Sequence, residues 1–302
     1  MIATIQLCTY KRPHLIGRVL EACFDQDVPG ADYEVVLVND GSPDDTVRVV
    51  EAMRSRARCA FTFITQENAG LARARNAGLG AVRGDIVIFI DDDVIPMPNF
   101  VREHIRSHAE HPRSVVRGAV INTKDVDALP PPMYSLANYS GNFFWTTNVS
   151  VPKKDLDAVG WFDESFTEYG WEDIDLGMRL RKARLRGVFN KAALAFHVKP
   201  PPDASAASAM VRQACAQART AVRLSEKHPH WRVALATGNN LPVRLVHRAI
   251  RGLGIARAGE PAAADGASEQ PLSPIGRLTA HLRAREAYFE EMDRVIADHA
   301  DR

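Results

Sequence analysis

The chain has 302 residues, enough for one large domain or two ordinary ones. It is 46% hydrophobic and 25% charged, which excludes a collagen-like, wholly disordered or disulfide-stapled chain. The 38 Lys and Arg residues against 37 Asp and Glu residues give a net charge of +1, so no overall field indicates a nucleic-acid partner. No apolar run approaches the roughly 18 residues of a membrane span.

The apolar first residues precede the first charges, the reverse of a secretory signal, and we expect a cytoplasmic protein. The spacing of the cysteines fits neither a zinc site nor a CxxC redox motif. Buried free thiols in a reducing compartment explain them. These residues are Cys8, Cys23, Cys59 and Cys215.

The first part of the chain alternates strand and helix signals. Apolar, β-rich runs predict strands at 2–9, 34–39, 61–65 and 85–90, and the VVLV run of the second is typical of a strand buried on both faces. Apolar residues at helical spacing predict helices after Pro13, from Val47 to Met53, over 71–82 and over 100–110. Strands separated by helices predict an α/β fold with a mostly parallel sheet covered on both faces.

After residue 110 the pattern changes. We expect strands at 115–123, 143–151 and 188–196, loops at 125–132 and 161–170, and a helix at 172–183. Mostly helical sequence follows at 204–226, 242–253 and 275–299. The corresponding organisation is a body over 1–200, a basic helical extension over 201–255, an Ala-, Gly- and Pro-rich linker over 256–274 and a final helix over 275–302.

Three predicted strands end in chemically active groups, at the edge where open α/β sheets bind ligands. These segments are TYKR at 9–12, NDGS at 39–42 and DDD at 91–93. Three adjacent carboxylates are costly unless a positive charge neutralises them. Mg²⁺ or Mn²⁺, with phosphate oxygens and water as further ligands, suits them best. A capped turn before Pro96 is the structural alternative.

A second acidic segment, WEDID at 171–175, opens a predicted helix. Helix capping alone explains carboxylates at a helix N-terminus. Adjacent carboxylates in a cleft also raise one another's pKa, which suits a general base, and Trp171 offers a flat platform for a sugar. His197 follows a short apolar run, and it is either a structural histidine or a metal ligand.

These segments, in this order, resemble glycosyltransferase family two, the inverting nucleotide-sugar transferases with the GT-A fold. The resemblance covers roughly residues 2–199, and its last block is similar to the C-terminal half-site of galactosyltransferase-like members. The matching text is TYKRPHLIGRVLEAC, VVLVNDGSPDDT, ENAGLARARNAGLGAVRGD, IVIFIDDDVIP and GWFDESFTEYGWEDIDLGMRLRKARLRG.

The resemblance implies a donor-binding half over 1–123 and an acceptor and base half over 124–200. Asp40 would contact the nucleotide base, and Asp91 the ribose or a metal-bound water. Asp92 holds the variable middle position of the DxD motif. The remaining donor-binding residues would be Thr9, Tyr10, Arg12, Arg73 and Asn76.

For the reaction, the resemblance implies that Asp173 is the catalytic base and that Glu172 and Trp171 bind the acceptor. Asp93 would ligate the metal, with Asp91 beside it, and His197 would complete the site. The implied reaction is one direct displacement at the anomeric carbon, with the metal neutralising the departing diphosphate. A UDP-sugar is the expected donor, and a glycan, glycolipid or small-molecule hydroxyl is the expected acceptor.

Two alternatives remain at this point. A nucleotidyltransferase would normally have a glycine-rich phosphate loop where this chain has TYKRP. A catalytically inactive nucleotide-sugar-binding or scaffolding module would differ in failing to transfer or hydrolyse the donor. Since no long apolar span is present, a single-addition transferase is favoured over a polymerising synthase.

Arg244, Arg248 and Arg251, together with the apolar residues of 242–253, form a basic amphipathic pattern. Such a helix either contacts an anionic membrane peripherally, through residues 240–255, or packs on the body with a solvated basic face.

Overall fold

The computed structural model describes residues 1–135, 138, 141–200, 202–240, 242–244 and 272–300. The chain divides into two compact units. The first comprises Met1–Thr167 and Glu172–Pro200, and the second Glu168–Trp171 and Pro201–Arg302. The division of the first unit into donor and acceptor halves stays a prediction.

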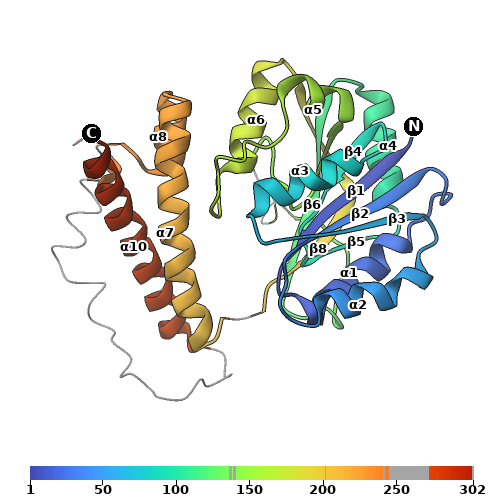
Figure 1. Cartoon of the computed structure of the whole chain (residues 1–302), viewed down its shortest axis with the longest axis horizontal. Helices are drawn as coiled ribbons and strands as arrows, with labels where there is room; N and C mark the ends of the chain where they lie inside the picture. The colour runs from blue at the N-terminus through green and yellow to red at the C-terminus, as the bar shows by residue number, and fades with distance from the viewer. Residues whose placement is uncertain (136–137, 139–140, 201, 241, 245–271, 301–302) are drawn as a thin grey trace. The chain divides into compact units, whose positions relative to one another are not determined.

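The first unit is built on a sheet whose described strands follow the order β3-β2-β1-β4-β7-β6-β8-β5 (Figure 1). β1, β2, β3 and β4 pair in parallel, as do β6 and β8, whereas β7 and β5 join their neighbours antiparallel. The strands are β1 (Ala3–Thr9), β2 (Tyr33–Asp40), β3 (Ala60–Gln66), β4 (Ile86–Phe89), β5 (Val94–Pro96), β6 (Ser114–Thr123), β7 (Val149–Pro152) and β8 (Arg186–Val198).

Helices cover both faces of this sheet, because the central strands are apolar on both sides. Ile86 and Ile88 of β4 pack into one core with α1, α2 and α4, and Val87 and Phe89 into another with α3, α5 and α6. The expected α/β fold is confirmed. The helices are α1 (Pro13–Phe24), α2 (Thr46–Met53), the 3-10 turn η1 (Arg54–Arg56), α3 (Leu71–Ala81), α4 (Phe100–Glu110), α5 (Lys153–Val159) and α6 (Glu172–Lys182).

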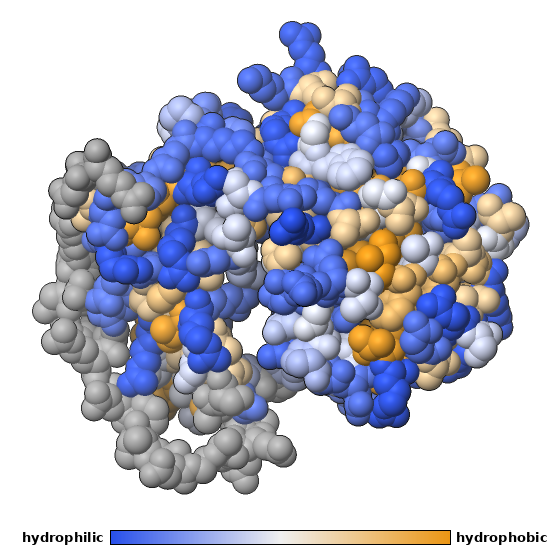
Figure 2. All heavy atoms as spheres, in the orientation of Figure 1, coloured by the Kyte–Doolittle hydropathy of each residue, from blue (hydrophilic) through white to orange (hydrophobic). Residues whose placement is uncertain are grey.

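The second unit is helical, as expected. Its long helices α7 (Ala204–Lys227) and α10 (Pro274–Ala300) share a small core that includes Ala221, Phe289 and Met292, and α8 (Trp231–Thr237) follows α7. Most of the predicted helix 242–253 and linker 256–274 lies outside the described residues, and with it the proposed membrane-contacting segment. Figure 2 shows hydrophilic and hydrophobic residues interspersed on the viewed face.

One strand prediction was wrong. Of 143–151, the strand is limited to β7, and the residues before it run irregularly. Phe144 turns into the core against Phe89 and Phe162, while Thr146 and Thr147 turn to polar partners, so no alternating face is left for a ladder. The short elements β5, α5 and α8 were not expected. The four cysteines are free, but Cys23 alone among them is fully buried.

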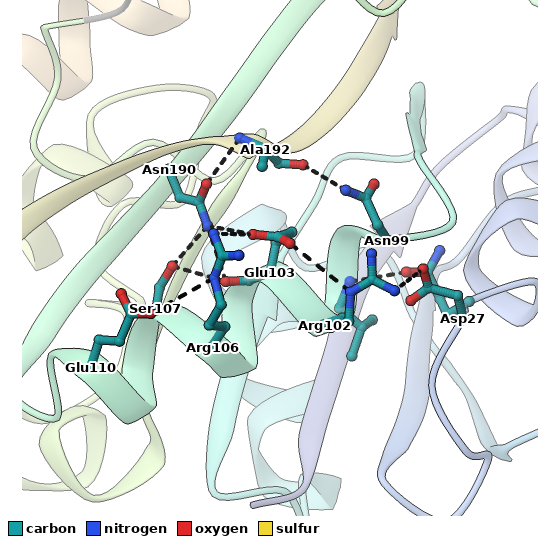
Figure 3. Close-up of polar contacts among 11 residues, drawn as sticks. Asp27, Asn99, Arg102, Glu103, Arg106, Ser107, Glu110, Asn190 and Ala192 are labelled. Carbon is teal, nitrogen blue, oxygen red and sulfur yellow. Dashed lines mark hydrogen bonds and ion pairs between the residues drawn. The ribbon is translucent and has the colours of Figure 1, made fainter.

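A bulge in β8 sets the position of its last residues. Opposite Gly118 and Ala119 of β6, the partner residue jumps from Asn190 to Leu194. A side chain on Gly118 would meet Ala193 O at 2.0 Å, so the close approach requires glycine. Asn190 ties the bulge to Glu103 and Ser107 of α4 (Figure 3). The register after the bulge places His197 opposite Val94 of β5.

Candidate functional site

The three predicted strand-end segments lie at one edge of the sheet, because β2, β1 and β4 are parallel neighbours. Thr9 pairs with Asn39 in the register of β1 and β2, and the acidic triplet at 91–93 follows β4. Beyond β1, Lys11 adopts a positive φ of 57° and its N–H donates to Ser42 Oγ. Tyr10 beside it is exposed.

Thr9 and Arg12 reach the acidic triplet directly. Thr9 Oγ1 donates to Asp92 Oδ2 at 2.8 Å, and Arg12 Nη2 lies 3.6 Å from Asp93 Oδ2. Burial raises the pKa of Asp92 to about 6, even though Arg12 and the Thr9 hydroxyl favour its ionised form. Part of the negative charge at this edge is therefore balanced within the protein.

Asp93 and His197 face each other across the β5–β8 junction. His197 Nε2 lies 3.2 Å from Asp93 Oδ1, and both side chains are largely buried. Burial alone would raise the pKa of Asp93, but the close approach of His197 and the positive charge of Arg12 outweigh that effect and lower it.

This pair fits a hard divalent cation. Two neighbouring ligands of an octahedral ion, each about 2.1 Å from it, are about 3 Å apart, close to the observed separation. The carboxylate oxygen suits Mg²⁺ or Mn²⁺, and the imidazole nitrogen is a common ligand of divalent metals in general. Within the described part of the chain, no group of three or more His, Cys, Asp or Glu side chains is placed to hold a metal ion. Further ligands would have to come from a bound diphosphate and water.

Arg75 connects the acidic triplet to the second acidic segment, and the sequence analysis missed it. Its guanidinium donates to Glu172 Oε1 and to Thr146 Oγ1, each at 2.6 Å, and lies 3.5 Å from Asp91 Oδ1. Helical periodicity carried the signal: Arg75 follows buried Ala72 by three residues and precedes buried Leu79 by four, so it lies on the inner face of α3.

Glu172 and Asp173 begin α6 beside this arginine. Glu172 is buried, and its Oε2 has no hydrogen-bond partner among the described residues. Asp173 is half-buried, and its Oδ1 accepts the N–H of Ile174. Burial, and then the neighbouring charge of Glu172, raise the pKa of Asp173 to about 7 against the opposing effect of Arg75. Trp171 belongs to the second unit, where its Nε1–H donates to Gln217 O.

Three predicted donor-binding residues make their contacts away from the acidic triplet and away from the second acidic segment. Asp40 is buried, and its carboxylate accepts hydrogen bonds from Gln66, Asn68 and the N–H groups of Ala69 and Gly70, so it holds the loop before α3. Arg73 and Asn76 both contact Glu164; Arg73 is exposed, and Asn76 also binds the backbone of Phe162. Their roles toward a nucleotide stay predictions.

Comparison with known proteins decides the family. A model described as Glycosyl transferase family 2 matches residues 4–160, more than half of the chain. The chain belongs to glycosyl transferase family 2. Validoxylamine A glucosyltransferase of Streptomyces hygroscopicus subsp. limoneus is 31% identical over 59% of this family 2 chain and 48% of the relative. Chondroitin synthase of Escherichia coli is 27% identical over 66% of this chain and 35% of the relative. The chain thus spans about half the length, or less, of these relatives.

Two solved structures are similar to this family 2 chain in fold. Mannosyltransferase PcManGT from Pyrobaculum calidifontis, solved with GDP-Man and Mn²⁺, has a TM-score of 0.59 at 18% identity, over 96% of this chain and 86% of that chain. S. aureus TarS 1-349, solved with UDP-GlcNAc, has a TM-score of 0.55 at 20% identity, over 72% of this chain and 66% of that chain. The expected GT-A fold is confirmed. Within the described residues, no helix is both long and apolar enough to cross a membrane.

Proposed function

We propose that this chain transfers a sugar from a UDP-sugar to an acceptor hydroxyl with inversion, using Asp173 as the general base. The observation that supports this proposal is the network around Arg75. Through this one buried cation, Asp91 of the strand-end site and Glu172 of the second acidic segment share a partner.

The raised pKa of Asp173 suits the proposed role. A carboxylate whose pKa is raised toward neutral pH accepts a proton more readily than an ordinary aspartate does. The acceptor hydroxyl would lose its proton to Asp173 while its oxygen attacks the anomeric carbon and the nucleoside diphosphate leaves. Glu172 Oε2, buried and unpaired among the described residues, would accept a hydrogen bond from the acceptor.

Asp93 and His197 would hold Mn²⁺ or Mg²⁺. When bound there, the cation neutralises the charge of the departing diphosphate. Arg12, 3.6 Å from Asp93, would stand beside the same phosphates. The names of the relatives and neighbours include several sugars, so the sugar and the acceptor remain to be found by screening.

The test compares the wild-type chain with Asp173→Asn, with nucleotide-sugars and Mn²⁺ present. We expect the variant to bind the UDP-sugar with unchanged affinity and to lose about 10²–10⁴-fold in transfer rate, the usual contribution of a general base. Asp163→Asn, in a loop of the same unit, is the matched control and should keep its rate. Substantial turnover by Asp173→Asn would remove Asp173 from the role of base, and binding without turnover by the wild type would indicate an inactive binding module.

A further inference from the structure

Positive charge gathers where α6 ends and β8 begins. Residues 176–202 contain no Asp or Glu and carry seven Lys and Arg residues. Arg179 is balanced by Asp175, 2.8 Å away. Four of the others are exposed and, among the described residues, have no carboxylate within ion-pair distance. These four, which we call the basic patch, are Arg181, Lys182, Arg184 and Arg186.

Contacts beneath the basic patch hold its members together. The N–H of Arg186 donates to the carbonyl oxygen of Arg113, the residue before β6. The guanidinium of Arg181 lies 4.5 Å from the centre of the Phe143 ring. The same ring closes on the start of β8, since a side chain on Gly187 would meet it at 3.2 Å. Phe143 therefore supports the planar fork of Arg181 next to the strand that carries Arg186.

Arg184 occupies a position where the fold itself favours glycine. Its φ is 64°, in the left-handed region. The N–H of Arg184 donates to Arg181 O, and the N–H of Leu185 donates to Leu180 O. These two bonds form a Schellman motif, and its left-handed position is usually glycine because a β-carbon is strained there. The turn therefore does not require arginine at position 184.

The helix dipole accounts for only part of this charge. The C-terminal end of a helix is equivalent to about half a negative charge. The last turn of α6 already holds three cations, at Arg179, Arg181 and Lys182, and Arg184 and Arg186 lie beyond it. Like charges in excess repel one another, so a bound anion would stabilise the basic patch.

The side chains of the basic patch narrow the class of anion. Guanidinium forks bind carboxylates and phosphates through two parallel hydrogen bonds. None of the large hydrophobic side chains that the described structure exposes belongs to the patch, so it offers no anchor to a bilayer. Single-stranded nucleic acid stacks on open aromatic rings, whereas Phe143 is covered by Arg181. A flexible anionic polymer without apolar parts fits best.

We propose that the basic patch binds an anionic glycan, a chain of sugars with several carboxylate or phosphate groups. His197 pairs with Asn122, eight residues after Ser114 at the start of β6, so the patch lies roughly 26 Å from His197 at about 3.3 Å per residue. Asp173 is closer, because eight residues of α6 separate it from Arg181, about 12 Å along the helix axis. The choice of a glycan rests on the proposed function, since a glycan held here would extend toward the proposed base as an acceptor.

The test measures binding of oligogalacturonate, a chain of uronate sugars, to the full chain without any nucleotide-sugar. A neutral malto-oligosaccharide of the same length is the comparison. We expect saturable binding of the anionic chain alone, with an affinity that falls as salt is added. Because no donor is present, this result does not depend on transfer, and Asp173→Asn should bind oligogalacturonate as the wild type does.

Two double variants remove equal charge from different places. Arg184→Gly with Arg186→Ser, in the basic patch, should weaken binding at least about tenfold, as expected for lost charge-assisted hydrogen bonds. Arg48→Ser with Arg54→Ser, at exposed positions of α2 and the adjoining 3-10 turn, should leave the affinity unchanged. Arg184→Gly alone should unfold at the same urea concentration as the wild type or a higher one, because it relieves the left-handed strain.

Four results would overturn the proposal. They are equal binding of the neutral oligosaccharide, unchanged affinity in the patch variant, an equal loss in both double variants, and patch-dependent binding of phosphatidylglycerol vesicles or a DNA oligonucleotide in place of oligogalacturonate. A chain that binds oligogalacturonate at the basic patch but transfers no sugar would contradict the proposed function and not this site.

Discussion

At the scale of single residues, Arg75 matters most, because it is the buried cation that three side chains of the site share. Arg73 lies two positions away on α3, but two residues correspond to about 200° of helix rotation, so the two arginines point to opposite sides. Arg75 is 5% exposed, and the Arg73 side chain is 65% exposed. The ARARN segment marks both as arginines, and helical periodicity puts only Arg75 on the inner face of α3.

These two arginines give a matched pair of variants. Arg75→Lys keeps the positive charge but loses the planar fork that reaches Glu172 and Thr146 at once. We expect it to lower the free energy of unfolding by about 1–3 kcal/mol and kcat/KM by at least about tenfold. Arg73→Lys should change stability by less than about 0.5 kcal/mol. Equal effects of the two variants, in urea unfolding and in transfer assays, would contradict the role given to Arg75.

The raised pKa of Asp173 predicts a pH dependence of the proposed transfer. The base is active when ionised, so activity increases with pH as Asp173 loses its proton at about pH 7. Below that pH the ionised fraction of Asp173 falls, so kcat/KM should decrease from its plateau as the pH is lowered. Asp92→Asn, which removes the other carboxyl with a raised pKa, should keep this acidic limb. A flat wild-type profile between pH 6 and 8 would argue against Asp173 as base.

At the scale of elements, the β8 bulge sets the register that places His197 beside Asp93. Asn190 donates to the Glu103 carboxylate and to Ser107 Oγ of α4, and its Oδ1 accepts the N–H of Ala192 in the bulge (Figure 3). The amide of Asn190 therefore connects α4 to the bulge. Asn190→Ala should lower the free energy of unfolding by about 1–3 kcal/mol, because the hydrogen bonds of this amide to Glu103, Ser107 and Ala192 are all lost. Lys191→Ala, next to it and exposed, is the control. If the two variants unfold at the same urea concentration, the bulge does not depend on this amide.

The packing of α4 on β7 predicts a loss of stability in mild acid. His104 and His108 have pKa values lowered by burial to about 3 and 4, against 6.5 in the unfolded chain. Below pH 6.5 the unfolded state therefore takes up protons that the folded state excludes, and stability falls as pH falls. At pH 5 each histidine should lower the free energy of unfolding by about 2 kcal/mol relative to its value at pH 7 or above.

Urea unfolding at pH 7 and pH 5 measures this effect. In His108→Gln the loss of stability between pH 7 and pH 5 should be about half that of the wild type. This holds regardless of how much the substitution lowers the free energy of unfolding at pH 7. An undiminished loss in the variant would place the proton uptake elsewhere.

At the scale of the whole molecule, we expect the metal to matter for catalysis and not for folding. Asp93 and His197 are held by the β5–β8 pairing and by Arg12, which are contacts within the chain itself. EDTA should therefore abolish transfer and leave the melting temperature of the free protein unchanged, with Mn²⁺ restoring activity. A UDP-sugar should raise the melting temperature when Mn²⁺ is present, by mass action. A large drop in melting temperature with EDTA alone would indicate a structural metal instead.

The order of the elements was readable from the sequence, because strands and helices leave local patterns. Periodicity, turns and apolar runs identified β1 to β4 and their helices within a few residues. The strand-end segments TYKR, NDGS and DDD could be assigned to one edge, since parallel strands end together. Family membership rests on the same ordered segments, and the family comparison bears it out.

The tertiary structure alone decided which side chains meet. The partners of Arg75, the approach of His197 to Asp93 through a bulge and the three-residue strand β5 all depend on contacts between distant segments. Residues 143–148 show the same limit, because their β-rich composition was overridden by the core around Phe144 and by the partners of Thr146 and Thr147. Local patterns follow from neighbours along the chain, whereas a site is made by neighbours in space.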